Sequence, residues 1–80
     1  MSQGQLVSPV PGVFFRRPAP DSPPYKEEGD AIVAGDVYCL IELMKTFYEV
    51  KAEIGGHIVK FLVEDNAAVE AGQPLVEMAT

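Results

Sequence analysis

Short segments of alternating apolar and polar residues run through the chain, and glycine or proline interrupts nearly all of them. No window of useful length repeats apolar residues at intervals of three and four, so the helical signal is weak. The segments rich in β-branched and aromatic residues lie at about residues 5–8, 12–16, 25–28, 37–43, 46–53, 56–63, 68–70 and 74–78. This spacing predicts an all-β sandwich or barrel.

Two of the longest segments are separated by only two residues, Met44 and Lys45. Antiparallel pairing across this turn predicts one largely apolar face, with the opposed pairs Leu43–Thr46, Ile41–Tyr48, Cys39–Val50 and Val37–Ala52. The opposite face is mixed, with the pairs Glu42–Phe47, Leu40–Glu49 and Tyr38–Lys51. Moving the register by one residue would put Glu49 on the apolar face. The pattern therefore predicts a hairpin with its tip at residues 44–45.

Met-Lys is an unfavourable sequence for such a tip. Two-residue hairpin turns need positive φ angles, which favour Asn-Gly, Asp-Gly or a leading glycine. A local rule that is broken within an otherwise consistent segment is expected at a functional site. An exposed amine at the apex of a hairpin suits covalent modification by another enzyme, which makes Lys45 the leading candidate residue.

The chain also repeats itself. Residues 28–39 align with residues 65–76, and residues 11–15 correspond to residues 55–59, so the first half contains about seven additional residues after Phe15. That additional segment, residues 16–24, holds four of the seven prolines. Because proline fixes φ and lacks a backbone donor, we expect a stiff protruding loop. Two similar halves predict a sandwich with an approximate two-fold axis, with the tip at one end and the termini at the other.

Composition narrows the possible functions. Eighty residues make one small domain, and a net charge of −6 argues against a nucleic-acid backbone or an anionic membrane as the main partner. The single cysteine, Cys39, allows no internal disulfide and is interpreted as a small buried hydrophobe. No secretory signal and no apolar stretch long enough to span a bilayer is visible. A cytoplasmic location is the resulting expectation.

Little else in the sequence indicates chemistry. Arg16 and Arg17 are interpreted as a solvated pair, with contact to a phosphate as the alternative, and His57 as a surface residue. The sequence has no set of histidine, aspartate and nucleophile, no cluster of metal ligands and no phosphate-binding glycine loop. We therefore expect a non-catalytic protein.

The stretch Glu42-Leu43-Met44-Lys45 resembles the biotin attachment motif of biotinyl domains, commonly Glu-Ala-Met-Lys-Met. Residues 8–16 resemble the first strands of the biotin carboxyl carrier proteins of bacterial acetyl-CoA carboxylases, and residues 18–21 resemble the protruding thumb of that family. Further similar stretches follow in order, at residues 28–29, 34–36, 39–42, 49–52, 55–56, 63–64 and 72–75. Leu43 and Thr46 depart from the usual alanine and methionine.

The resemblance implies a flattened barrel or sandwich of two four-stranded antiparallel sheets, spanning residues 1–80, with biotin attached covalently to Lys45. A biotin protein ligase would attach it, recognising Met44, which would also pack beside the biotin stem. The thumb residues expected to touch the biotin ring are Pro18, Ala19, Pro20, Asp21 and Ser22. The carrier would shuttle carboxyl-biotin between a biotin carboxylase subunit and a carboxyltransferase subunit, in acetyl-CoA carboxylase and fatty acid synthesis.

Three alternatives stay open at this point. The domain could serve a biotin-dependent carboxylase of another specificity, because Leu43 and Thr46 flank the lysine. It could be a lipoyl domain, which shares the architecture but typically has aspartate where this chain has Met44. It could also be an unmodified β-sandwich that acts as an adaptor, in which case Lys45 would have no special role.

Overall fold

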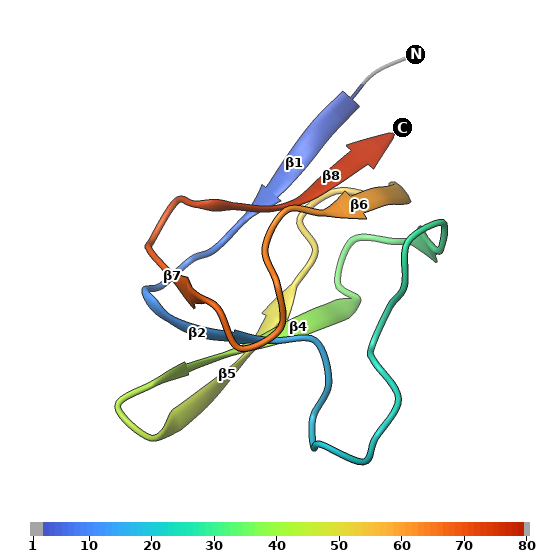
Figure 1. The fold of residues 1–80 in the computed structure, drawn as a ribbon. Coiled ribbons are helices and arrows are strands. Elements are labelled where there is room, and N and C mark those ends of the chain that lie inside the picture. Colours follow the sequence, from blue (N-terminus) through green and yellow to red (C-terminus); the bar gives the residue numbers. More distant parts are fainter. Residues whose placement is uncertain (1–2, 80) are drawn as a thin grey trace.

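The computed structural model describes residues 3–79, which form eight β-strands in two antiparallel sheets. One sheet has the order β1-β8-β6-β3 and the other the order β5-β4-β2-β7 (Figure 1). The strands are β1 (Gln3–Val7), β2 (Gly12–Phe15), β3 (Ala31–Ile32), β4 (Val37–Leu43), β5 (Thr46–Lys51), β6 (Gly56–Phe61), β7 (Ala68–Val69) and β8 (Pro74–Ala79). The predicted all-β sandwich of two four-stranded sheets is confirmed, and the sheets do not close into a barrel.

The internal repeat appears in the structure as a quasi-two-fold arrangement. The repeat makes β1 equivalent to β5, β8 to β4, β6 to β2 and β3 to β7. Exchanging each strand for its equivalent converts one sheet order into the other. The turns before β4 and β8 match closely. The amide of Gly35 donates to the carbonyl of Ala52 at 2.9 Å, and the amide of Gly72 donates to the carbonyl of Ser8 at 2.7 Å. Both glycines have positive φ angles, 97° and 82°, which explains the residue type at both positions.

The core lies between the two sheets and draws equally on both halves. Its fully buried members include Phe14 and its equivalent Ile58, and Cys39 and its equivalent Val76. The complete buried cluster consists of Leu6, Phe14, Ile32, Tyr38, Cys39, Ile41, Val50, Ala52, Ile58, Val69, Leu75, Val76 and Met78. Burial of this apolar surface, at roughly 25 cal/mol per Å², is the main stabilising contribution in so small a domain.

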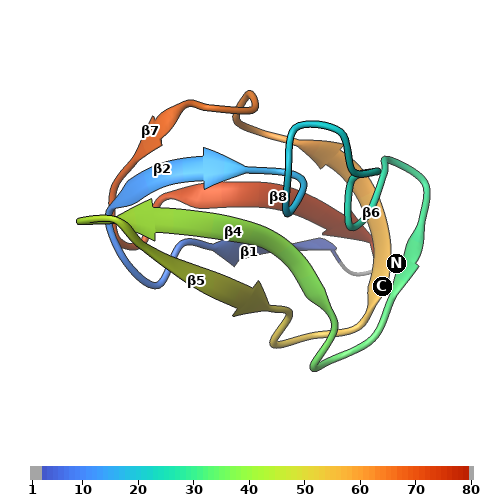
Figure 2. The same cartoon turned by 90° about the horizontal axis from the view of Figure 1, so that it is seen from below.

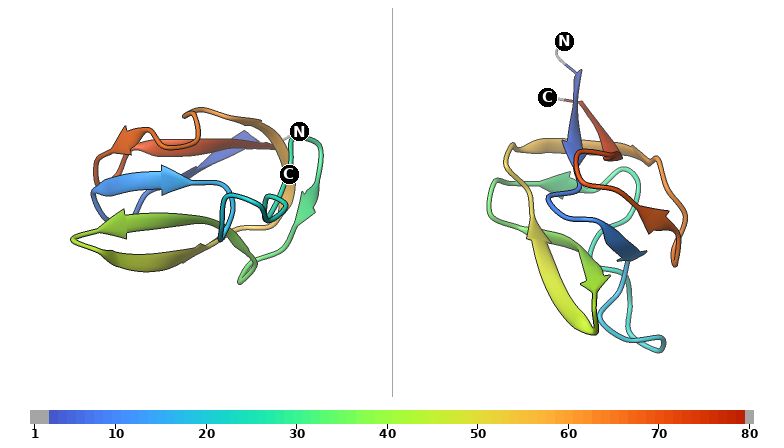
Figure 3. Two further views of the ribbon diagram at one scale, coloured as in Figure 1. Left: turned by 60° about the horizontal axis from the view of Figure 1, so that its bottom comes forward. Right: turned by 90° about the vertical axis from the view of Figure 1, so that its left-hand side faces the viewer.

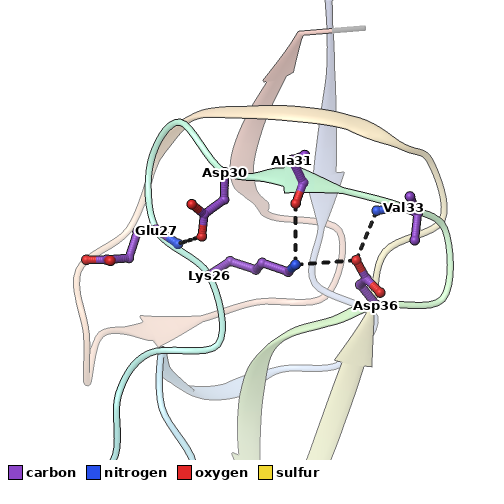
Figure 4. A network of polar contacts seen from close by, with 6 residues as sticks. All are labelled: Lys26, Glu27, Asp30, Ala31, Val33 and Asp36. Carbon is purple, nitrogen blue, oxygen red and sulfur yellow. Dashed lines mark hydrogen bonds and ion pairs between the residues drawn. The ribbon is translucent and has the colours of Figure 1, made fainter.

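The strand expected at residues 25–28 is absent, and β3 lies later in the sequence. Polar contacts hold residues 25–36 as successive turns instead (Figure 4). Lys26 Nζ donates to the carbonyl of Ala31 at 3.3 Å and lies 3.5 Å from a carboxylate oxygen of Asp36. The same oxygen of Asp36 accepts the amide of Val33 at 3.0 Å. These side-chain bonds compete with strand pairing, so only two residues of this region join the sheet.

The predicted register of the β4–β5 hairpin is confirmed near its tip and wrong at its base. Leu43 pairs with Thr46, Ile41 with Tyr48 and Cys39 with Val50, as expected. Val37 pairs with Lys51 and not with Ala52, because the register shifts between Val37 and Cys39. A β-bulge of this kind redirects side chains. It explains why Tyr38, expected on the mixed face, is buried in the core.

The hairpin tip and the two chain ends lie at opposite ends of the sandwich, as predicted (Figure 2). β4 runs toward the tip through the middle of its sheet, with β5 and β2 on either side. The lysine-bearing turn is therefore supported by an interior strand whose residues 38–41 are buried. A rigid support of this kind fixes the tip relative to the rest of the domain.

Candidate modification site and thumb groove

The turn at the hairpin tip places two consecutive non-glycine residues in the left-handed region of backbone space. Met44 has a φ of 52° and Lys45 a φ of 65°. Positive φ at both central residues is the geometry of a type I′ turn, which matches the twist of the flanking strands. For residues other than glycine this conformation costs roughly 1–2 kcal/mol per residue. The expected two-residue turn is present, and its sequence is unfavourable for it.

Both tip side chains face away from the protein. Met44 is 89% exposed, and Lys45 is exposed as well. A methionine that packs against no core surface contributes nothing to folding by burial. The tip thus combines backbone strain with exposure to solvent. Such a combination is expected where a second protein must reach the lysine.

Residues 16–24 form the predicted protruding loop, here called the thumb (Figure 3). Its base is closed by the amide of Tyr25, which donates to the carbonyl of Arg16 at 3.0 Å. Its outer turn is closed by the amide of Ser22, which donates to the carbonyl of Ala19 at 3.0 Å. Arg17 Nη1 donates to the carbonyl of Ser22 at 3.2 Å, across the loop. The thumb is therefore a structured loop with its own hydrogen bonds.

The interpretation of Arg16 and Arg17 as a solvated pair is wrong, because both are half-buried and bond to other residues. The guanidinium carbon of Arg16 lies 4.1 Å from the ring centroid of Phe61, a cation–π contact. The backbone amide of Arg16 also donates to Asp65 Oδ1 at 2.9 Å. Arg16 thus fixes the base of the thumb to the opposite half of the sandwich, while Arg17 turns back into the thumb.

A groove of about 410 Å³ lies between the thumb and the outer face of the β5-β4-β2-β7 sheet. Its lining residues are Phe15, Arg17, Pro18, Ala19, Pro20, Leu40, Phe47, Asp65 and Asn66. The floor is apolar, and the rings of Phe15 and Phe47 pack with centroids 6.2 Å apart. The polar groups belong to Arg17, Asp65 and Asn66. An apolar groove with a few polar groups is typical of small-molecule sites.

The groove lies close to the candidate lysine. Phe47 is the second residue of β5 and follows Lys45, in the turn, by two positions, a separation of about 7 Å along the backbone. Of the thumb residues expected to contact a cofactor, Pro18, Ala19 and Pro20 line the groove. Asp21 and Ser22 are not among the lining residues, and the carbonyl of Ser22 accepts the bond from Arg17.

Sequence reasoning missed the floor of the groove. Leu40 and Phe47 lie on the face that the sequence predicts as mixed, and apolar residues on such an outer face are a signal of a covered or ligand-binding surface. Phe47 is 57% exposed, so the thumb covers it only in part. The contribution of Asp65 and Asn66 depends on long-range folding that brings the β6–β7 connection next to the thumb.

Other candidate chemistry is limited within the described part of the chain. Burial raises the pKa of the Cys39 thiol to about 12, which removes it as a nucleophile at neutral pH. His57 is exposed, as expected, and residues 3–79 contain no group of three or more potential metal ligands. Over the same residues, no helix exists that could cross a membrane.

The fold and the tip together define a class of protein, the β-sandwich domains that carry an exposed lysine at the tip of one hairpin. A family model described as biotin-requiring enzyme matches residues 4–78, which is most of the chain. The chain belongs to this biotin- and lipoyl-domain family.

Curated relatives include biotin carboxyl carrier proteins of acetyl-CoA carboxylase. The protein from Nostoc sp. is 38% identical over 92% of this chain and 41% of its own length. The chloroplastic protein 2 from Arabidopsis thaliana is 40% identical over 92% of this chain and 29% of its own length. The protein from Chlamydia pneumoniae is 35% identical over 98% of this chain and 47% of its own length. The chain thus spans less than half of each of these relatives.

Solved structures with the same fold include domains of carboxylases. The Kluyveromyces lactis urea carboxylase matches 99% of this chain and 6% of its own, with a TM-score of 0.77 and 30% identity. A single-chain, multi-domain long-chain acyl-CoA carboxylase matches 98% of this chain and 7% of its own, with a TM-score of 0.75 and 25% identity. In both cases the similar region is a small part of a much larger enzyme.

Proposed function

We propose that this domain is a biotin carboxyl carrier and that biotin is attached through an amide to Nζ of Lys45. The observation that carries the proposal is the tip itself, where a strained, exposed Met-Lys turn replaces the glycine-containing turn that folding alone would favour. The family match and the carrier proteins among the relatives support this function.

The groove fits the chemistry of biotin, whose head combines an apolar fused ring with a cyclic urea. Phe15, Leu40 and Phe47 offer an apolar surface for the rings. The polar residues that line the groove offer the donors of Arg17, the acceptors of Asp65 and the mixed amide of Asn66, which suit a urea that both donates and accepts. Bound biotin supplies a ureido nitrogen that can accept and release a carboxyl group.

The carrier would itself perform neither the carboxylation nor the transfer. Its proposed partners are a biotin protein ligase, a biotin carboxylase subunit and a carboxyltransferase subunit of acetyl-CoA carboxylase, working in the cytoplasm. Each encounter must be brief, so small and weak contacts around the exposed tip are sufficient. Met44, 89% exposed, is the side chain that a ligase would meet next to the lysine. Tethering keeps the effective concentration of the carried group high without tight binding.

The first experiment treats the purified domain with a biotin protein ligase, ATP and biotin, and measures the intact mass. We expect one added biotinyl group on the wild type and on the matched control variants Lys51→Arg and Lys60→Arg, and none on Lys45→Arg. Biotin on Lys45→Arg would contradict the assignment of the residue. Transfer of lipoate in place of biotin by the corresponding ligase would favour the lipoyl alternative.

The second experiment concerns the acyl acceptor. The biotinylated domain is incubated with a biotin carboxylase, ATP and labelled bicarbonate, and then with carboxyltransferases for acetyl-CoA, for a longer acyl-CoA and for urea. We expect label to pass to acetyl-CoA. Transfer to another acceptor with none to acetyl-CoA would keep the carrier function and change the partner, as the departures at Leu43 and Thr46 would allow.

A further inference from the structure

Arg17 is the cationic side chain that lines the thumb groove, and within the described residues no carboxylate oxygen lies within ion-pairing distance of it. Among residues 3–79, the one ion pair within bonding distance joins Lys26 and Asp36. The carbonyl of Ser22 takes a single N–H of the five that the Arg17 guanidinium carries. Arg17 Nε is buried and has no hydrogen-bond partner within the described chain. A buried donor without an acceptor is costly and calls for a physical explanation.

The neighbouring Arg16 provides an internal comparison. Its Nε is also buried without a partner, but its guanidinium lies over the ring of Phe61 and its Nη2 donates to the carbonyl of Lys26 at 3.4 Å. Arg16 does not line the groove. Its position is accounted for by the attachment of the thumb. Arg17 bonds to Ser22 across the thumb, but this bond uses one N–H donor, and the other donors of its guanidinium have no partner among the described residues.

The surroundings of Arg17 favour an anion as its partner. The groove floor is formed by apolar side chains, and charges interact more strongly beside such surfaces than in bulk water. A neutral urea would need only neutral donors. A guanidinium is suited to a carboxylate, which it can bind through two parallel N–H···O bonds. Asp65 lines the same groove and would repel an anion, so selectivity for an anion requires the attraction of Arg17 to outweigh this carboxylate.

We propose that Arg17 makes the thumb groove selective for the carboxyl-bearing form of the carried group over its uncarboxylated form. This inference rests on the proposed function, because the tether at Lys45 brings the group to the groove. The consequence is a resting position that holds the loaded group next to the domain between visits to the two partner enzymes. Arg17 acts here as a binding and positioning residue, and the carboxyl group stays intact on the ureido nitrogen throughout.

The test uses the ¹⁵N-labelled domain, biotinylated and checked by intact mass. Amide shifts of Phe15, Leu40 and Phe47 are recorded in the cold before and after carboxylation by a separate biotin carboxylase with ATP and bicarbonate. In the wild type, we expect carboxylation to change these amide shifts, because the carboxylated group should occupy the groove for a larger fraction of the time than the uncarboxylated group. Arg17→Gln should reduce the affinity of the groove for the carboxylated group by roughly tenfold, the loss of one charge-assisted contact. Arg17→Lys should retain part of the effect.

Lys51→Gln is the matched control, because it removes an exposed cation from β5, the strand that carries Phe47, and Lys51 does not line the groove. It should leave the carboxylation-dependent shifts in place. Equal carboxylation-dependent shifts in Arg17→Gln and wild type would overturn the proposal. So would groove shifts that are the same before and after carboxylation.

A second arm separates this inference from the proposed function. Allophanate, the N-carboxylate of urea, is titrated into Lys45→Arg, which cannot carry a tethered group. Shifts at the groove that disappear in the double variant Lys45→Arg/Arg17→Gln would support the role of Arg17 even if the ligase experiment failed. Shifts that persist in the double variant would contradict it, whatever the state of Lys45.

Discussion

The two halves of the sandwich share their buried positions and differ in their connections. Phe14 and Ile58 occupy equivalent places in the core, and the turns at Gly35 and Gly72 make equivalent hydrogen bonds. By contrast, the connection from β2 to β3 contains the thumb, whereas the connection from β6 to β7 spans only residues 62–67. The shared features are those that folding requires, and the unshared features build the candidate site.

The residues with positive φ angles differ in the same way between the repeat and the hairpin tip. Where the repeat needs a positive φ it has glycine, as at Gly35 and Gly72, or asparagine at Asn66 with a φ of 72°. At the hairpin tip, the same backbone conformation is occupied by methionine and lysine. Asparagine and glycine are the favoured residues in such turns. The tip is therefore less stable with methionine and lysine than it would be with the favoured residues.

Truncation of the equivalent core residues should produce the largest effects and should affect the two halves alike. Phe14→Ala and Ile58→Ala remove fully buried side chains, and each should cost roughly 3–5 kcal/mol, including the cavity left behind. Urea unfolding monitored by circular dichroism measures the loss. A large cost in one half with little in the other would show that the two halves do not share one cooperative core.

Gly12→Ala should cause the next largest loss of stability, because it disturbs both packing and backbone conformation. An added Cβ would overlap the carbonyl oxygen of Glu42 and lie 2.8 Å from Cγ2 of Ile41, and the φ of Gly12 is 156°. We expect a loss of roughly 2–3 kcal/mol, within the range for overpacked sites. Gly35→Ala is the matched control, since its Cβ would meet nothing within 4 Å. It should lose only about 1 kcal/mol, and equal losses would contradict the steric explanation.

The alkaline stability of the domain should depend on Cys39, whose equivalent in the other half is Val76. Burial raises the pKa of the Cys39 thiol from 9.0 to about 12. Between these values the unfolded thiol loses its proton and the folded thiol keeps it, so the folded state binds more protons. Its stability then falls with increasing pH, by at most about 1.4 kcal/mol per pH unit.

Cys39→Val introduces the residue type found at the equivalent position of the other half, Val76, and removes the titrating thiol. Urea unfolding at pH 8, 9.5 and 11 should therefore show a shallower decline for the variant than for the wild type. The decline that remains is assigned to Tyr38 and Tyr25, because burial also raises the pKa of each phenol. Identical declines in both proteins would mean that the thiol does not titrate in the unfolded chain as proposed.

Replacement of Met44-Lys45 by Asn-Gly should give the smallest effect, and in the stabilising direction. The substitution supplies the residues that a type I′ turn favours and should add about 1 kcal/mol, or roughly 4–8 °C in the midpoint of thermal unfolding. Calorimetry measures this shift. A midpoint that is unchanged or lower would show that the Met-Lys tip is not strained, and would remove one argument for its functional selection.

The sequence was sufficient to predict most strands, the two-residue turn and the protruding loop, because alternation, proline and the internal repeat are local signals. β3 was misplaced because the bonds of Lys26, Asp30 and Asp36 compete with pairing, and a period-two pattern carries no information on them. The bulge that buries Tyr38 is likewise invisible to simple alternation.

The groove could be foreseen only in part. The prolines of the thumb marked one wall, whereas the floor combines residues from three strands and the polar group combines Arg17 with residues 65 and 66. Such a surface arises from tertiary packing and not from any one segment. Arg16 and Arg17 illustrate the difference, because adjacent residues of the same type serve separate purposes that only their contacts reveal.

The most direct test of the account is the mass of the protein isolated from its native host, followed by peptide mapping. The account predicts one biotinyl group, located on the peptide that contains Lys45. A bare Lys45 in cells supplied with biotin and its ligase, or the group on Lys26, Lys51 or Lys60 instead, would contradict it.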